Sequence, residues 1–185
     1  MPAEKRPRRS DALRNRDKLL STAVELLSAR GLDVPMDEVA RQAGVSIGTL
    51  YNHFPTRQDL YDAILPGRLA AFEKIAETAL AEEDPWRAFT GYLDDLFSMQ
   101  AGDRGLNDTM SRRYFLSDEV DEICRRGFDQ AVLIFERAKA AGRLRPDFEA
   151  QDLAMLVWAV SQLIRESADW RRFLDLHIGG LRVGD

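Results

Sequence analysis

The segment VSIGTLYNHF, residues 45–54, carries small and polar side chains where a core helix would carry apolar ones. Gly48 costs about 1 kcal/mol relative to alanine inside a helix, so helix stability does not account for it. A glycine lets the backbone approach a phosphate, which the free N–H groups and the helix dipole attract. Thr49, Tyr51 and His53 have groups that donate hydrogen bonds to phosphates or, for threonine and tyrosine, pack on thymine methyls. The segment therefore predicts contacts to DNA.

Two short helices are expected around this segment, at about 36–43 and 47–53, with a turn at 44–46. This arrangement is a helix-turn-helix, in which the second helix enters the major groove of DNA. Leu50 and Phe54 are expected to face inward and hold the second helix on its support. The side chains between them then face outward.

The remaining chain predicts an all-α fold with about nine helices. Apolar residues recur at spacings of three and four almost throughout, and no segment shows a convincing strand alternation. Serine, threonine, aspartate and proline mark the helix starts, and glycine marks several ends. The first helix is expected to start at the cap Ser10, and the helix after the helix-turn-helix to run from Arg57 to about Leu80. The next helix is expected to start at Asp84-Pro85 and to be followed by a loop at 101–108. The remaining helices are expected at 108–115, 117–142, 150–167 and 169–182.

Pro66-Gly67 falls inside the predicted helix that begins at Arg57. Proline removes one backbone hydrogen bond and its ring strikes the carbonyl four residues earlier, so a kink or break is expected near Leu65. Two interpretations stay open. The joint is either a hinge that responds to a ligand or a static kink that fits two domains together.

Charge is distributed unevenly along the 185 residues, whose net charge is −5. Residues 1–68 hold 11 Lys/Arg and 9 Asp/Glu, a net of +2, whereas residues 69–185 hold 15 and 22, a net of −7. The first part thus suits a polyanionic partner better than the total charge suggests. Without a long apolar run, a cytoplasmic, nucleoid-associated protein with no membrane partner is expected. Cys124 is the only cysteine, which excludes an intrachain disulfide.

The segments LLSTAVELLSARG and EVARQAGVSIGTLYNHFPTRQDL give the chain a close resemblance to the TetR family of transcriptional regulators over about residues 13–64. The resemblance implies a dimeric DNA-binding protein whose C-terminal domain binds a small-molecule effector. The implied organisation is a flexible basic arm at 1–9, a helix-turn-helix domain at 10–56 and an effector-binding and dimerisation domain at 57–185. The DNA-contacting residues are then Ser46, Ile47, Gly48, Thr49, Tyr51, Asn52, His53 and Arg57.

The chain departs from the family pattern at two positions. Pro35 stands where the family often has a threonine that caps the second helix and contacts phosphate, and Ile47 replaces a frequent lysine. Non-specific affinity for DNA then depends more on the basic residues near the N-terminus. These residues are Lys5, Arg6, Arg8, Arg9, Arg14 and Arg16.

The C-terminal part contains two groups of apolar residues, one that could line an effector cavity and one that could form a dimer interface. An aromatic set forms either plain core or the wall of an effector cavity for a ligand of apolar or aromatic character. The cavity residues predicted from it are Trp86, Phe89, Leu93, Phe97, Tyr114, Phe128 and Phe135. The last two helices are expected to form a two-fold interface, with Met155 and Trp158 off the face that their own domain covers. The interface residues predicted there are Leu153, Leu156, Val157, Val160, Trp170, Phe173, Leu174 and Ile178.

Other functions leave little trace in the sequence. Two histidines outside any metal-binding spacing predict no metal site, and the absence of G-x-S-x-G, Walker and G-x-G-x-x-G patterns predicts neither an enzyme nor a cofactor. The function predicted is an effector-released repressor that binds a near-palindromic operator. Two alternatives stay open: a helical enzyme with an incidental helix-turn-helix, and an effector-independent DNA-binding protein.

Overall fold

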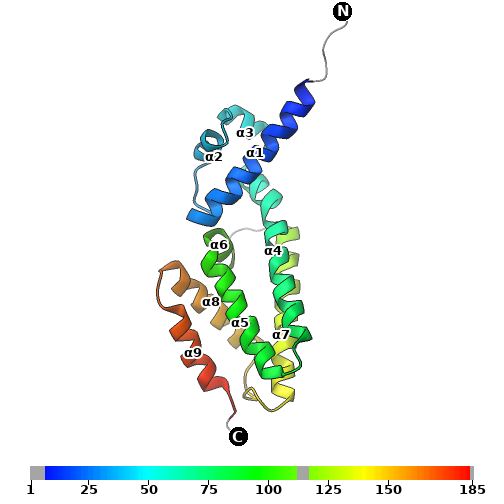
Figure 1. Cartoon of the computed structure of the whole chain (residues 1–185), viewed down its shortest axis with the longest axis vertical. Coiled ribbons are helices and arrows are strands. Elements are labelled where there is room, and N and C mark those ends of the chain that lie inside the picture. The colour runs from blue at the N-terminus through cyan, green and yellow to red at the C-terminus, as the bar shows by residue number, and fades with distance from the viewer. Residues whose placement is uncertain (1–6, 112–116, 184–185) are drawn as a thin grey trace, which may run out of the picture.

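The structure is a computed structural model, and it describes residues 7–111 and 117–183, with side chains from Asp11 onward (Figure 1). The described residues contain helices and no strand, with one isolated β-bridge between Leu144 and Arg182, which confirms the predicted all-α class. The helices are α1 Pro7–Arg30, α2 Met36–Gln42, α3 Ile47–His53, α4 Arg57–Ala81, α5 Pro85–Gly102, α6 Arg104–Ser111, α7 Asp118–Ala140, α8 Ala150–Arg165 and α9 Trp170–Leu181.

Most helix boundaries lie where local signals predicted them. Thr56 and Asp59 form a reciprocal capping box at the start of α4, and Asp84 accepts from the N–H groups of Trp86 and Arg87 at the start of α5. Ser117 caps α7 in the same way as a side-chain acceptor. Each cap satisfies N–H groups that have no partner within their own helix.

Two predicted boundaries are wrong. α1 begins at Pro7, so Ser10 lies inside the helix and does not cap it. The predicted loop at 101–108 is instead the end of α5 followed by α6, and Asp103 accepts from the N–H of Leu106 between them. The glycines suggested a loop because glycine weakens helices. Here Gly105 is needed for close packing, because a Cβ would lie 3.0 Å from the carbonyl oxygen of Leu27 on α1.

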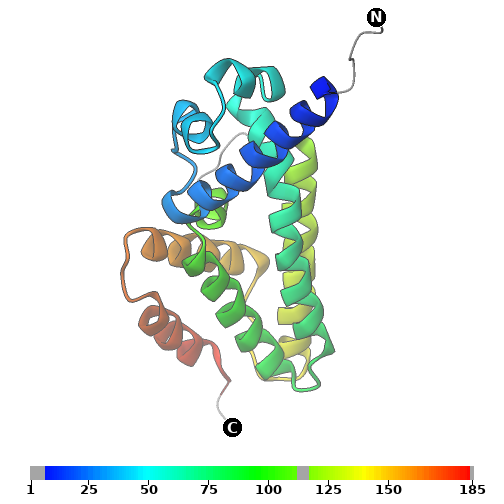
Figure 2. The ribbon, with the colours of Figure 1, turned by 45° about the horizontal axis from the view of Figure 1, so that its top comes forward.

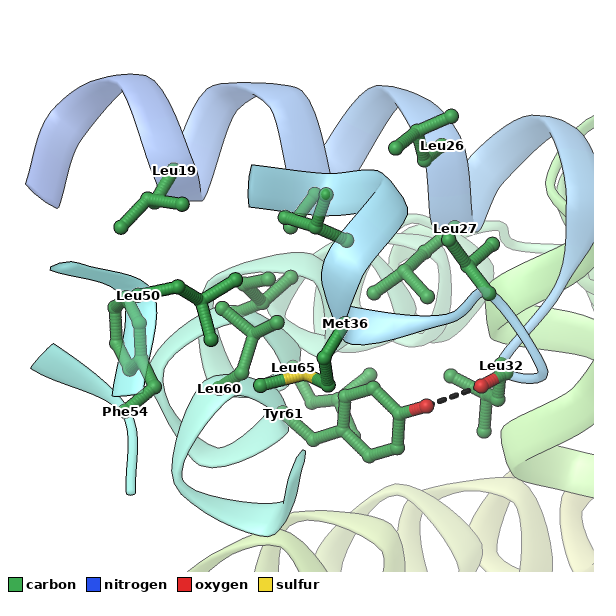
Figure 3. Close-up of a cluster of buried hydrophobic side chains, with 14 of the residues drawn as sticks. Leu19, Leu26, Leu27, Leu32, Met36, Leu50, Phe54, Leu60, Tyr61 and Leu65 are labelled. Carbon is green, nitrogen blue, oxygen red and sulfur yellow. Dashed lines mark hydrogen bonds between the residues drawn. The ribbon is translucent and has the colours of Figure 1, made fainter. Parts of the chain in front are cut away.

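The N-terminal helices pack around a hydrophobic cluster that continues into α4 (Figure 3). Leu19 and Leu27 of α1, Leu50 of α3 and Leu60 and Leu65 of α4 are at most 1% exposed. Burying a leucine fully contributes about 1.5 to 3 kcal/mol. Because α4 supplies part of this cluster, the packing that holds the helix-turn-helix extends beyond residue 56.

The second hydrophobic cluster occupies the C-terminal body. α4 and α7 run side by side, α5 packs against both, and α8 packs across α5 and α6 (Figures 1 and 2). Edge-to-face contacts of Phe148 with Phe89 and with Phe135, at centroid distances of 5.9 and 5.3 Å, join the segment before α8 to α5 and α7. α9 packs against α8 and leaves most of its own surface exposed.

α4 links the two clusters and is continuous from Arg57 to Ala81, with Pro66 inside it. The break predicted near Leu65 is therefore wrong, while a kink and a hinge stay predictions. Leu65 and Leu69 are buried on either side of the proline, at 0% and 1% exposure. Burial of these neighbours helps to hold the helix across a residue that cannot donate its own backbone hydrogen bond.

Candidate DNA-binding site and internal cavity

The second helix of the helix-turn-helix, α3, is held by one buried residue and one cap. Leu50 is 0% exposed, and Phe54 directly after the helix is 2% exposed. The Ser46 hydroxyl accepts a 3.1 Å hydrogen bond from the N–H of Thr49, and the two hydroxyls lie 2.8 Å apart. Gly44 makes the preceding turn with φ of +69°, a conformation that favours glycine. The turn and the buried residues leave the opposite side of α3 facing out.

That outward side carries most of the predicted DNA-contacting residues. Ile47 is 42% and Tyr51 is 47% exposed, so both side chains are accessible to a partner outside the chain. Asn52 is also exposed, whereas Thr49 and His53 are half-buried. The structure thus brings these residues together on one short helix. Their contacts with DNA stay predictions.

Gly48 has no structural role within the chain. The nearest atom to a Cβ built at this position is the Ser46 hydroxyl oxygen, 3.9 Å away, so a side chain would fit without any clash. The φ angle of Gly48 is not in the left-handed range either. A glycine that the fold does not require, on an exposed helix start, is consistent with a molecule outside the chain approaching the backbone there.

Arg57 does not have the position predicted for it. Its side chain is half-buried, and Nη1 donates to the carbonyl oxygens of Leu32 at 3.0 Å and Val34 at 2.9 Å. Tyr61 also donates its hydroxyl hydrogen to Leu32 O, as Figure 3 shows. Arg57 is directed toward its own chain because the carbonyls between α1 and α2 lie within its reach, and its contact with phosphate stays a prediction. Arg57 fastens that loop to α4.

Arg16 lies closer to α3 than its place in a basic arm suggested. Its guanidinium group stacks over the Phe54 ring at 5.2 Å from the centroid, next to the end of α3. Pro35 precedes α2 without a side-chain cap, as the sequence indicated. Lys5 and Arg6 lie outside the described residues, and the side chains of Arg8 and Arg9 are not described. Arg14 is 68% exposed on α1.

A partly open cavity of about 60 Å³ lies between α4, α5, α7 and α8, with Met110 of α6 also at its wall. Its walls are almost entirely apolar. Gly127 contributes to them, and nothing lies within 4 Å of a Cβ built there. A glycine in the middle of α7 costs helix stability, and this was the one sequence signal that could have located the cavity. The lining residues are Leu69, Phe72, Glu73, Tyr92, Leu96, Met110, Ile123, Cys124, Gly127, Phe128, Ala131, Leu153 and Val157.

Three polar groups border this cavity. The Tyr92 hydroxyl makes no hydrogen bond to any residue in the described ranges, although the side chain is only 7% exposed. Burial raises the pKa of Tyr92 to about 12, which keeps the phenol neutral at physiological pH. Burial, together with the charge of Asp121, also raises the pKa of the Cys124 thiol. Glu73 lies at the rim in an ion pair with Arg126.

The predicted effector residues are only partly those of the cavity. Phe128 lines it, but Phe89, Leu93, Phe97 and Phe135 do not; they are at most 1% exposed and belong to the packed core. The reason is that neighbouring stripes of side chains on one helix face different surroundings. On α5 the stripe at residues 89, 93 and 97 faces the core, and the neighbouring stripe with Tyr92 and Leu96 faces the cavity.

Trp86 and Tyr114 are the other two predicted effector residues. Trp86 is half-buried at the start of α5, with the Arg182 guanidinium 5.7 Å from its ring, and it does not line the cavity. Tyr114 lies outside the described residues.

The outer face of α8 and α9 carries four large apolar side chains that are exposed to solvent. Met155 is 60%, Trp158 59%, Leu176 67% and Phe173 37% exposed. The exposure of Met155 and Trp158 agrees with the expectation that they lie off the face covered by their own domain. Four of the predicted interface residues are wrong, because they are at most 3% exposed and pack inside the same chain. These are Leu153, Leu156, Val160 and Leu174; Val157, Trp170 and Ile178 are half-buried.

Fold and site together define a helix-turn-helix DNA-binding protein with a second helical domain. No helix in the described part is long and apolar enough to cross a membrane. Residues 19–64 match the family model for bacterial regulatory proteins of the tetR family, and residues 84–183 match the model for the C-terminal domain of SbtR-like transcriptional regulators. The chain belongs to the TetR family and is a DNA-binding transcriptional regulator.

Individual relatives agree with this family. A crystal structure of a TetR regulator from Mycobacterium vanbaalenii has 32% identity and a TM-score of 0.58, covering 96% of this chain and all of that one. The repressor KstR of Mycobacterium tuberculosis is 28% identical, over 95% of this chain and 84% of KstR. FadR of Bacillus subtilis, in complex with stearoyl-CoA, shares the fold at 16% identity and a TM-score of 0.64, over 89% of this chain and 96% of FadR. The match to a Staphylococcus aureus regulator spans only 54% of that protein.

Proposed function

We propose that this regulator is a cytoplasmic, homodimeric repressor that binds a near-palindromic operator and leaves it when a small apolar effector fills the cavity between α4, α5, α7 and α8. The observation that carries the DNA-binding part is the outward side of α3. It combines a glycine that the fold does not need with an exposed tyrosine. Hydrogen-bond donors and a free backbone at a helix start suit phosphates and base edges.

Operator binding is tested by electrophoretic retardation of the protein's own promoter fragment, at two salt concentrations. Tyr51→Ala removes a 47% exposed side chain that makes no hydrogen bond or ion pair with the described residues, so the fold is expected to persist while operator affinity falls about 5- to 100-fold. Leu133→Ala is the matched control, since Leu133 is 57% exposed on α7. Operator affinity equal to the wild type in Tyr51→Ala would remove this residue from the interface.

The proposed dimer forms through the outer face of α8 and α9. Met155, Trp158, Phe173 and Leu176 present apolar side chains to solvent, and packing them against the same residues of a second copy would remove them from water. Two antiparallel pairs of helices would form a four-helix bundle. Such a dimer would place the two α3 helices about 34 to 36 Å apart, one turn of DNA.

The effector class follows from the walls of the cavity. Apolar side chains dominate, so the main part of the ligand is apolar. The unpaired Tyr92 hydroxyl can donate to or accept from one polar group, such as a hydroxyl or carbonyl. A volume of about 60 Å³ is small, so binding requires the side chains around it to move apart. FadR shows that a related fold accommodates a long acyl chain.

A cavity-filling variant separates effector response from operator binding. Gly127→Leu places a side chain in space where no atom lies within 4 Å of the Cβ, and it also replaces a helix-weakening glycine. We expect operator affinity like that of the wild type and loss of release by 1-octanol, 4-propylphenol and octanoate. Release by one of these probes that persists in Gly127→Leu would place the effector elsewhere.

A further inference from the structure

A second, polar cleft of about 210 Å³ lies where the end of α1 meets α6 and the end of α8. Figure 2 shows these three helix segments meeting between the helix-turn-helix and the C-terminal body. The polar side chains that line the cleft are Arg30, Arg104, Asn107, Asp108, Arg165 and Ser167. This cleft shares no lining residue with the apolar cavity. The polar cleft is therefore a separate site from the apolar cavity.

Three arginines from three different helices converge on this cleft. Arg30 pairs with Glu38, which also pairs with Arg41, and Arg165 lies 3.4 Å from the exposed Glu166. Arg104 is exposed and makes no ion pair or hydrogen bond with any residue in 11–111 or 117–183. The cleft thus holds one cation without a partner among the described residues, and two whose carboxylates are shared or solvated.

One carboxylate lies among these arginines, and one of its oxygens already accepts a hydrogen bond from another segment of the chain. Asp108 is 5% exposed, and its Oδ2 accepts a 2.9 Å hydrogen bond from the N–H of Leu32. That bond joins α6 to the segment after α1. The lining residues carry three positive charges against this single negative one, so an anion in the cleft would be attracted.

Two more lining residues differ in what the fold explains. Ser167, with φ of +57°, ends α8 in a Schellman cap, in which its N–H donates to Ile164 O and the N–H of Ala168 donates to Leu163 O, so the helix end accounts for its conformation. Asn107 has a feature that the fold does not explain. Asn107 is 2% exposed and donates to the carbonyl oxygen of Ser161, while its Oδ1 has no partner in the described chain.

We propose that this cleft binds a small polyanionic metabolite through guanidinium–oxyanion contacts, with Arg104 as the principal cation. Guanidinium groups match the oxygens of phosphates and carboxylates in geometry and charge. A water molecule occupies about 30 Å³ in the liquid, so the cleft has room for several waters or one small anion. The ligand is either a phosphate or phosphate ester, or a di- or tricarboxylate. Both offer the same anionic oxygens.

Such a ligand would connect two parts of the molecule. Arg30 ends α1, the first helix of the helix-turn-helix unit, whereas Arg104 and Arg165 belong to the C-terminal body. An anion held by all three would restrict the movement of one part against the other. This ligand site is independent of the proposed effector cavity.

Isothermal titration calorimetry on the full chain without DNA tests the site. Inorganic phosphate, glucose 6-phosphate and citrate are titrated separately, with ionic strength held constant by sodium chloride. We expect saturable binding of at least one with a Kd below about 5 mM, and Arg104→Gln is expected to raise that Kd about tenfold, as loss of one charge-assisted contact predicts. Binding of citrate alone identifies a polycarboxylate site, and binding of phosphate or its ester identifies a phosphate site.

Arg87→Gln is the matched control for charge. Arg87 is 74% exposed near the start of α5, whereas the cleft adjoins the end of that helix. Its Kd should stay within about twofold of the wild type, because removing a distant exposed charge has a small effect. Equal affinity of Arg104→Gln and Arg87→Gln for the anion would overturn the proposal, as would no saturable heat with any of the three at about 10 mM.

Discussion

Replacing Arg57 by methionine separates a structural role from a DNA-contacting one. The substitution keeps an unbranched chain but removes the donors to Leu32 O and Val34 O. Leu32 O keeps the hydrogen bond from Tyr61, whereas Val34 O loses the contact made by Arg57. A hydrogen bond from a charged donor contributes about 1.5 to 3 kcal/mol, and Arg57 is half-buried, so we expect a total loss of about 2 kcal/mol in the free energy of unfolding.

Urea denaturation followed by circular dichroism measures this loss, with the concentration of protomers held constant because the proposed dimer couples stability to concentration. With an m-value of about 2 kcal/mol/M, the midpoint should fall by about 1 M. Arg41→Met is the control, because Arg41 is 72% exposed and its ion pair with Glu38, at 3.4 Å, is open to solvent. The urea midpoint of Arg41→Met should change little. If Arg57→Met unfolds like the wild type and binds operator about tenfold more weakly, the phosphate-binding role is right and the structural one is refuted.

Four further variants test other parts of the structure. Gly48→Ala should raise the free energy of unfolding by about 1 kcal/mol, because nothing obstructs the new methyl, and should weaken operator retardation. Burial raises the pKa of Tyr92 to about 12, whereas the phenol ionises near pH 10 in the unfolded chain. The free energy of unfolding of the wild type should therefore fall by about 2 to 3 kcal/mol between pH 10 and 12. Unfolding curves of Tyr92→Phe at alkaline pH should lack this fall. Trp158→Lys places a charge on the proposed dimer face, and sedimentation at micromolar concentration should show monomers; an unchanged dimer would move the interface elsewhere. The double change of Pro66 and Gly67 to alanine should stabilise α4 and, if the joint is a hinge, alter effector-induced release more than effector-free affinity.

Local signals predicted most helix starts correctly because capping is a local interaction. Ser46, Asp84 and the Thr56–Asp59 pair each act on N–H groups within three residues, so no distant part of the chain is needed to recognise them. The helix-turn-helix was equally accessible. Its polar, glycine-containing second helix stands out against the apolar periodicity of the rest of the chain.

Predictions that depend on which face a helix turns toward its neighbours were less successful. Apolar periodicity showed that Leu153 and Leu156 face something apolar, but it does not distinguish a core from a dimer face. The same limit applied to Phe89 and Phe97, which are core rather than cavity. Arg57 was misplaced for a similar reason: its acceptors lie more than 20 residues earlier in the chain, in a loop whose path the sequence does not reveal.

The backbone hydrogen bonds of Leu32 limit how regulators can be engineered by exchanging domains. Its N–H binds Asp108 of α6, and its carbonyl accepts from Tyr61 of α4, so one short loop is held by two elements outside residues 1–56. Gly31 beside it has no room for a side chain, because a Cβ would overlap the Asp108 carboxylate. A chimera that joins this N-terminal segment to another regulator at residue 56 would leave both partners behind. A transplant that keeps the orientation of the DNA-binding helices has to include matching residues on α4 and α6.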